Sequence, residues 1–80
     1  MNYINKAKVI LSKGDFYILS DLNYCYIIEC SDELHSEDII AWDETGTFFY
    51  NVTENYEVYA AMQYEAISRQ SALECLNKCR

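Results

Sequence analysis

Proline is absent from this chain of 80 residues, and glycine occurs only twice. So little of either residue argues against a disordered or linker-rich protein, and the length predicts one domain over residues 1–80. Apolar runs are short as well, since stretches such as Cys25 to Ile28 are far too short to cross a bilayer. No charged-then-apolar leader opens the sequence, so we expect a cytoplasmic protein whose four cysteines are reduced thiols.

Lysine and arginine are absent from the whole middle of the chain. Between Lys13 and Arg69 there are twelve Asp and Glu residues and no basic residue. The net charge of −7 therefore combines a strongly acidic middle with two basic ends. Such charge segregation argues against binding of DNA or RNA by this protein, because phosphates would be repelled. The six basic residues are Lys6, Lys8, Lys13, Arg69, Lys78 and Arg80.

Residues for catalysis and metal binding are scarce. The chain has one histidine, His35, no nucleophile-elbow or phosphate-loop motif, and no lysine in its middle to act as a base or electrophile. The segment around His35 fits neither a calcium loop nor a zinc motif. Cys25 and Cys30 differ in parity along one expected strand, so they should face opposite sides of the sheet, and the four cysteines are not expected to converge on one zinc ion. We therefore predict a non-enzyme without cofactor or metal.

Apolar and aromatic residues are plentiful: about half of the chain is apolar, with eight Tyr, three Phe and one Trp. Over residues 3–13 they recur at helical spacing, and Gly14 stands where a C-terminal cap is expected, so a helix is favoured there. A strand over 6–12 competes with this interpretation, because Ala7, Val9 and Leu11 also alternate. The residues of the helical face are Tyr3, Ile4, Ala7, Ile10 and Leu11.

Short aromatic and β-branched runs separated by turn residues predict the strands. Residues 43–46 (Asp-Glu-Thr-Gly) have the composition of a hairpin turn. A single helix over 56–79 would have to reverse its buried face midway, whereas residues 56–66 alternate cleanly at period two. A strand is therefore expected there, followed by Ser68 as the N-cap of a helix over 69–79. The expected strands are 15–20, 24–30, 38–43, 47–52 and 56–67.

These elements predict an α+β fold in the order α-β-β-β-β-β-α, with four to five antiparallel strands and both helices packed on one face. The basic residues would then belong to the two helices. Two short helices cannot cover both faces of such a sheet. Yet Tyr24 to Ile28 and Phe48 to Tyr50 are apolar on both sides, which predicts aromatic residues on the open face. A strongly curled sheet that buries both of its sides is the alternative.

Acidic residues are the main candidate binding residues, because seven carboxylates fall within the sixteen residues from Glu29 to Glu44. A surface that is merely soluble normally mixes both signs, although solubility alone remains an alternative explanation. A compact acidic domain can occupy a basic groove that otherwise binds nucleic acid, and it can add aromatic contacts. The candidate partner-binding residues are Asp32, Glu33, Glu37, Asp38, Trp42, Asp43, Glu44, Tyr59 and Tyr64.

In size, charge and tyrosine content, though in no motif, the chain resembles the small acidic α+β inhibitors that phages and mobile elements encode, such as anti-CRISPR proteins. The resemblance implies a stoichiometric inhibitor that mimics nucleic acid and binds a basic, nucleic-acid-binding surface of a bacterial complex. The alternative is a non-catalytic structural or adaptor protein that homodimerises through an uncovered, tyrosine-rich sheet face. Neither hypothesis involves a membrane.

Overall fold

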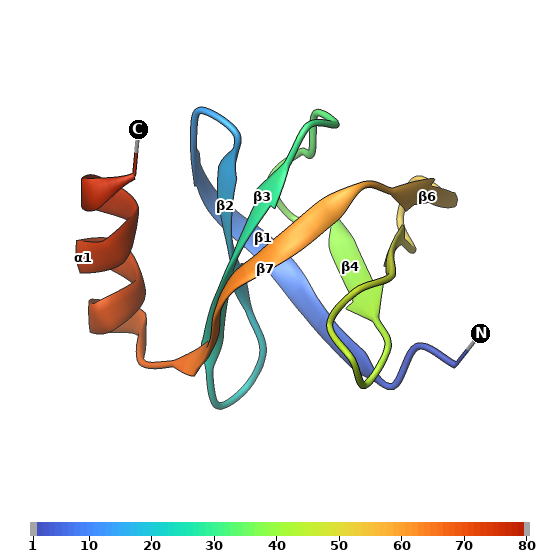
Figure 1. The fold of residues 1–80 in the computed structure, drawn as a ribbon, viewed down its shortest axis with the longest axis horizontal. Helices are drawn as coiled ribbons and strands as arrows, with labels where there is room; N and C mark the ends of the chain where they lie inside the picture. Colours follow the sequence, from blue (N-terminus) through green and yellow to red (C-terminus); the bar gives the residue numbers. More distant parts are fainter. Residues whose placement is uncertain (1, 80) are drawn as a thin grey trace.

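The chain begins with a strand, and the helix expected over 3–13 is wrong. In the computed structural model, which describes residues 2–79, β1 spans Asn5–Lys13 (Figure 1). Ala7 and Val9 are buried while Lys6 and Lys8 are exposed. Burial therefore alternates from one residue to the next, as in a strand. β1 lies at the centre of the sheet, where pairing with strands on both sides outweighs the helix propensity of its residues.

Seven antiparallel strands and one helix are found within residues 2–79, so the expected order α-β-β-β-β-β-α is wrong. The fold is a single small domain that is mostly sheet. Its strand order is β6-β5-β4-β1-β2-β3-β7. After β1, the elements are β2 Phe16–Ser20, β3 Cys25–Cys30, β4 Ile39–Trp42, β5 Phe49–Asn51, β6 Tyr56–Val58, β7 Ala60–Ile67 and α1 Arg69–Lys78.

The two outermost strands of the sheet, β6 and β7, are consecutive in the chain and are separated only by Tyr59. The strand expected over 56–67 is thus interrupted, because its first part pairs with β5 and its second part pairs with β3. One chain segment can reach both ends of the strand order only if the sheet curls until those ends approach each other. Figure 1 shows β7 crossing the molecule from the side of α1 to β6.

Curling of the sheet encloses the larger of two hydrophobic cores, which we call the inner core. Its centre includes Trp42 and Phe49, both almost fully buried. The opposite face of β2 and β3 is covered by α1, whose Ala72 and Leu76 belong to the second cluster. One helix is sufficient because the curl itself closes the other face. The curled alternative is therefore the observed arrangement, and neither face of β2 or β3 is left open.

The C-terminal helix begins where the sequence predicts. Ser68 Oγ accepts the backbone N–H of Ser71 at 3.1 Å, which confirms Ser68 as the N-cap. Near the other end, Lys13 Nζ donates to the carbonyl of Asn77 at 2.8 Å, a favourable place for a cation beside a helix C-terminus. No helix formed by residues 2–79 combines the length and the apolar character needed to cross a membrane.

Candidate functional site

The predicted acidic residues are divided by β4 into two groups. Four of them lie in the connection between β3 and β4, and two lie beyond the opposite end of β4. Asp38 and Asp43 flank the four residues of β4 and lie about 16 Å apart along the strand, so the six carboxylates do not form one continuous cluster. The first group is Asp32, Glu33, Glu37 and Asp38, and the second is Asp43 and Glu44.

Asp38 is buried and has a structural role. Its Oδ2 accepts the N–H of Asn51 Nδ2 and the backbone N–H of His35, both at 3.0 Å. Asn51 is itself fully buried, and its Oδ1 accepts the backbone N–H of Glu54 at 2.9 Å. Because Asp38 is only 4% exposed, its carboxylate cannot contact the surface of a partner in this fold.

Asp43 is likewise engaged, within the connection between β4 and β5. Its Oδ1 accepts the backbone N–H groups of Thr47 at 3.1 Å and Phe48 at 3.0 Å, and its Oδ2 accepts the hydroxyl of Thr45. These bonds favour the charged form. The pKa of Asp43 is therefore lowered from 3.8 to about 2, with the Thr45 hydrogen bond as the largest cause. Asp43 organises the hairpin turn, and Glu44 is the exposed carboxylate beside it.

Stability at low pH should depend on Asp43. Its pKa in the folded chain lies below its ordinary value of 3.8, so the ionised carboxylate stabilises the fold above about pH 4. This contribution should disappear as the pH falls towards about 2. Urea unfolding measured across this window should show a shallower loss of stability for Asp43→Asn than for the wild type. The control Glu44→Gln should keep the wild-type profile, and an unchanged profile for Asp43→Asn would contradict this role.

Trp42 lies in the inner core and not at the surface. Its side chain is fully buried, and its ring meets that of Tyr26 edge-on with centroids 4.9 Å apart. Phe49 packs on another side of the indole, with a centroid distance of 6.1 Å. Trp42 therefore contributes to stability and has no surface available for binding a partner.

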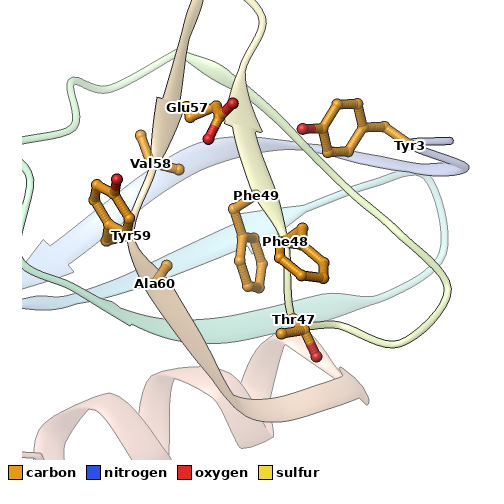
Figure 2. Close-up of a pocket in the computed structure, with 8 residues that line it drawn as sticks. All are labelled: Tyr3, Thr47, Phe48, Phe49, Glu57, Val58, Tyr59 and Ala60. Atoms are coloured by element: carbon orange, nitrogen blue, oxygen red, sulfur yellow. The ribbon is translucent and has the colours of Figure 1, made fainter. Parts of the chain in front are cut away.

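A groove opens where the ladder between β5 and β6 ends. The last paired residues are Phe49 and Val58, and beyond them the two chain segments diverge. The space between the segments has a volume of about 390 Å³ and is rich in aromatic residues (Figure 2). We call it the aromatic groove. Its lining residues are Tyr3, Thr47, Phe48, Phe49, Glu57, Val58, Tyr59 and Ala60.

Two of the aromatic rings at the groove are exposed to solvent. Phe48 is 51% exposed and Tyr59 is 77% exposed, whereas Phe49 belongs to the inner core. Figure 2 shows the rings of Tyr59 and Phe48 on either side of Phe49. Successive side chains of an extended chain point to opposite faces, so one of two adjacent phenylalanines must face outward. The candidate residues predicted from the sequence included Tyr59 but not Phe48 or Tyr3, although the run Phe48-Phe49-Tyr50 had itself predicted exposed aromatic residues.

The aromatic groove adjoins the acidic connection between β3 and β4. Asp32 Oδ2 accepts the backbone N–H of Tyr59 at 3.0 Å, which ties the two segments together. The side chain of Glu33 is 86% exposed, and Glu57 lines the groove itself. None of the described residues that line the groove is basic. Glu57 was not predicted, because nothing in its sequence context distinguishes it from the other glutamates. We name Asp32, Glu33, Phe48, Glu57 and Tyr59 the acidic-aromatic surface.

The remaining predicted residues do not line the aromatic groove. Glu37 forms an ion pair with Lys8 of β1, with 3.0 Å between Oε2 and Nζ. Tyr64 is half-exposed on β7, where it pairs with Ile27 of β3. Glu44 lies at the far end of β4. The structure therefore brings together Asp32, Glu33 and Tyr59 from the predicted set.

Groups suited to coordination chemistry are dispersed. Within residues 2–79, no three His, Cys, Asp or Glu side chains are arranged to hold a metal ion. Cys25 lies beneath α1 while Cys30 lies in the inner core, so these two thiols face opposite sides of the sheet, as their parity predicted. The acidic-aromatic surface places negative charge beside exposed aromatic area.

Comparison with known proteins assigns no family. No protein-family model matches the chain, and no match is found among curated proteins or solved structures. The geometry of the acidic-aromatic surface is therefore the main observation that bears on function.

Proposed function

We propose that this protein is a non-catalytic inhibitor that binds a basic partner protein through the acidic-aromatic surface. The partner's surface is one that ordinarily binds nucleic acid, within a bacterial defence or regulatory complex, and its occupation excludes the nucleic acid. The hydrogen bond from the Tyr59 N–H to Asp32 Oδ2 is the observation that carries this proposal. It joins an exposed aromatic groove to carboxylates that form no ion pair with a lysine or arginine of residues 2–79.

Charge and aromatic area have different roles in such a complex. The carboxylates attract a basic surface and raise the association rate, an effect that salt screens over a length of about 8 Å at physiological ionic strength. Tyr59 and Phe48 supply apolar area that becomes buried on binding, and desolvated aromatic residues carry much of the binding energy of interfaces. A phosphate backbone lacks such side chains. The aromatic contacts therefore favour the protein over a nucleic acid of higher charge density.

Solubility alone explains this surface less well. Asp32, Glu33 and Glu57 have no ion pair with a lysine or arginine of residues 2–79, whereas Glu37 is paired with Lys8. Unpaired carboxylates of one sign repel each other, and this repulsion destabilises a domain of 80 residues that has little stability to lose. A soluble surface with mixed charges would avoid that cost.

Reversal of two charges on the acidic-aromatic surface tests the proposal. The variant Glu33→Lys with Glu57→Lys should bind the partner about tenfold more weakly, because both substitutions place cations against a basic surface. The control, Glu65→Lys with Glu74→Lys, has the same net charge but alters exposed carboxylates of β7 and α1. The partner is captured from a bacterial lysate at low salt and then purified. Affinities of the variants and displacement by duplex DNA are measured on the purified partner.

Three outcomes would contradict the proposal: full binding by Glu33→Lys with Glu57→Lys, equal losses in this variant and the control, or a partner that binds the protein and DNA at the same time. The wild-type complex should also weaken steeply as the salt concentration rises. Light scattering tests the alternative, a homodimeric adaptor. A mass of two chains that persists in high salt would favour the adaptor over the inhibitor.

A further inference from the structure

Cations gather beside the exposed side of β1. Lys6 and Lys8 point outward from β1, and Arg69 is the first residue of α1. The sequence predicted the basic residues on two helices, whereas these three lie on one strand and one helix. All three line one hollow that also involves the turn between β2 and β3. Its volume is about 570 Å³, which lies within the usual range of about 300–1,000 Å³ for sites that bind small organic molecules. We call it the cationic hollow.

Two of these three cations have no ion-pair partner within the part of the chain that the structure describes. Lys8 is bound to Glu37, but neither Lys6 nor Arg69 forms an ion pair with any carboxylate of residues 2–79. Lys8 is the only lysine or arginine of residues 2–79 that forms an ion pair, although the chain contains 13 carboxylate side chains. The unpaired cations therefore provide positive charge that the fold itself does not use.

Asp21 is the one carboxylate among the described residues that line the cationic hollow, and its oxygens are engaged elsewhere. Oδ1 accepts the backbone N–H groups of Asn23 and Tyr24, both at 2.7 Å, and Oδ2 accepts the hydroxyl of Tyr26 at 2.6 Å. The Tyr26 hydrogen bond is the main reason that the pKa of Asp21 is lowered. Asp21 thus stabilises its own turn and leaves Lys6 and Arg69 to other anions.

Apolar side chains complete the cationic hollow. Ile10 of β1 and Ile39 of β4 are partly exposed there, and Leu22 at the tip of the turn between β2 and β3 is completely exposed. The cationic hollow therefore offers a ligand both a charged and an apolar environment. The charge comes from Lys6, Lys8 and Arg69, and the apolar area from Ile10, Leu22 and Ile39.

We propose that the cationic hollow binds a small organic anion with one negatively charged headgroup and an apolar body. The headgroup is bound by Lys6 and Arg69, and the apolar body packs on Ile10, Leu22 and Ile39. This site stands on observations separate from the acidic-aromatic surface and does not depend on the function proposed above.

Charge balance selects a ligand with a single charge. The three cations, together with Asp21 of the lining and Glu37 bound to Lys8, carry a net charge of +1 at the cationic hollow. One monovalent headgroup neutralises that charge. A polyanion such as nucleic acid would instead be repelled by the whole chain, whose net charge is −7.

Octanoate is the probe for this site, and binding is followed by the shifts of backbone amide resonances in NMR spectra. We expect saturable shifts at residues 6–10, 20–22 and 69–70. The variant Lys6→Gln with Arg69→Gln should weaken octanoate binding about tenfold, because it removes the charge-assisted hydrogen bonds to the headgroup. Leu22→Ser should weaken it through loss of apolar contact. Lys78→Gln, which removes a cation outside the hollow, should leave the affinity unchanged.

Two further ligands separate the contributions of charge and apolar area. Acetate carries the headgroup alone and 1-octanol carries the chain without charge, so both should bind more weakly than octanoate. The proposal is overturned if either binds as tightly as octanoate, if Lys78→Gln loses as much affinity as the double variant, or if octanoate causes no saturable shift. All the substituted side chains are exposed, and circular dichroism verifies that each variant remains folded.

A membrane lipid offers the same chemistry as a free amphiphilic anion. Sedimentation with phosphatidylglycerol vesicles distinguishes the two sources. We expect no co-sedimentation, because an anionic bilayer repels a chain of net charge −7. Co-sedimentation that is lost in Lys6→Gln with Arg69→Gln would overturn the assignment to a free ligand.

Discussion

Replacement of Trp42 by alanine is expected to remove a large fraction of the stability of this protein. Trp42 is fully buried in the inner core against Tyr26 and Phe49. Truncation of such a side chain costs about 3–5 kcal/mol, since it removes buried area and leaves a cavity. A domain of this size has a free energy of unfolding of about 4–12 kcal/mol, so the loss is a large fraction of the total. Urea unfolding followed by far-ultraviolet circular dichroism measures it.

The matched control for this prediction is Trp42→Phe. The indole Nε1–H of Trp42 is buried and has no hydrogen-bond acceptor within residues 2–79. Phenylalanine loses some volume but also removes that unsatisfied donor, so its cost should be only about 1 kcal/mol. If Trp42→Phe destabilises the fold as much as Trp42→Ala, the indole N–H has an unrecognised role. If Trp42→Ala costs less than about 1 kcal/mol, the inner core is not centred on Trp42.

Replacement of Asp38 by alanine should be the next most destabilising change, at about 2–4 kcal/mol. The substitution leaves the buried Asn51 amide without an acceptor, and a buried unsatisfied donor incurs its full desolvation cost. It also removes the bond to the backbone of His35. The connection between β3 and β4, which contains Asp38, is also hydrogen-bonded to β1. Val9 N–H donates to the Asp38 carbonyl at 2.9 Å, and Glu37 N–H donates to the Val9 carbonyl at 2.8 Å. The amides of Val9 and Glu37 should therefore exchange faster with solvent.

A double-mutant cycle with Asn51→Ala isolates the interaction between Asp38 and Asn51. The loss in Asp38→Ala with Asn51→Ala should be smaller than the sum of the two single losses, since each single variant leaves one partner unsatisfied. Glu33→Ala is the control, because Glu33 is an exposed carboxylate of the same connection and should change stability by no more than about 0.5 kcal/mol. Equal costs for Asp38→Ala and Glu33→Ala would contradict the structural role of Asp38.

The predicted surface residues illustrate what a linear pattern leaves undecided. Charge alone made Asp38 and Asp43 equivalent to Glu33, yet both aspartates are buried among backbone N–H groups and side-chain donors. Aspartate side chains in turns frequently accept hydrogen bonds from nearby backbone N–H groups, and this tendency was available as a warning. Glu57 reaches the candidate site only because β6 pairs with β5.

Local sequence determined those elements whose signals lie within a few residues of one another. The turn at residues 43–46 joins β4 and β5 as expected, and Ser68 caps α1, because turn chemistry and caps act over three or four residues. The acidic middle of the chain and its lack of lysine and arginine were also read correctly as composition. Composition did not determine what the acidic residues bind.

Tertiary structure alone decided the conformation of residues 3–13 and the two candidate surfaces. Ala7 pairs with Ile40, and this distant pairing turned a segment with helical spacing into the central strand. Curling of the sheet then brought Asp32 to Tyr59 and set Lys6 in one hollow with Arg69. Such contacts depend on the closure of the whole sheet, since hydrogen bonds between distant strands and burial of a shared core outweigh local propensity.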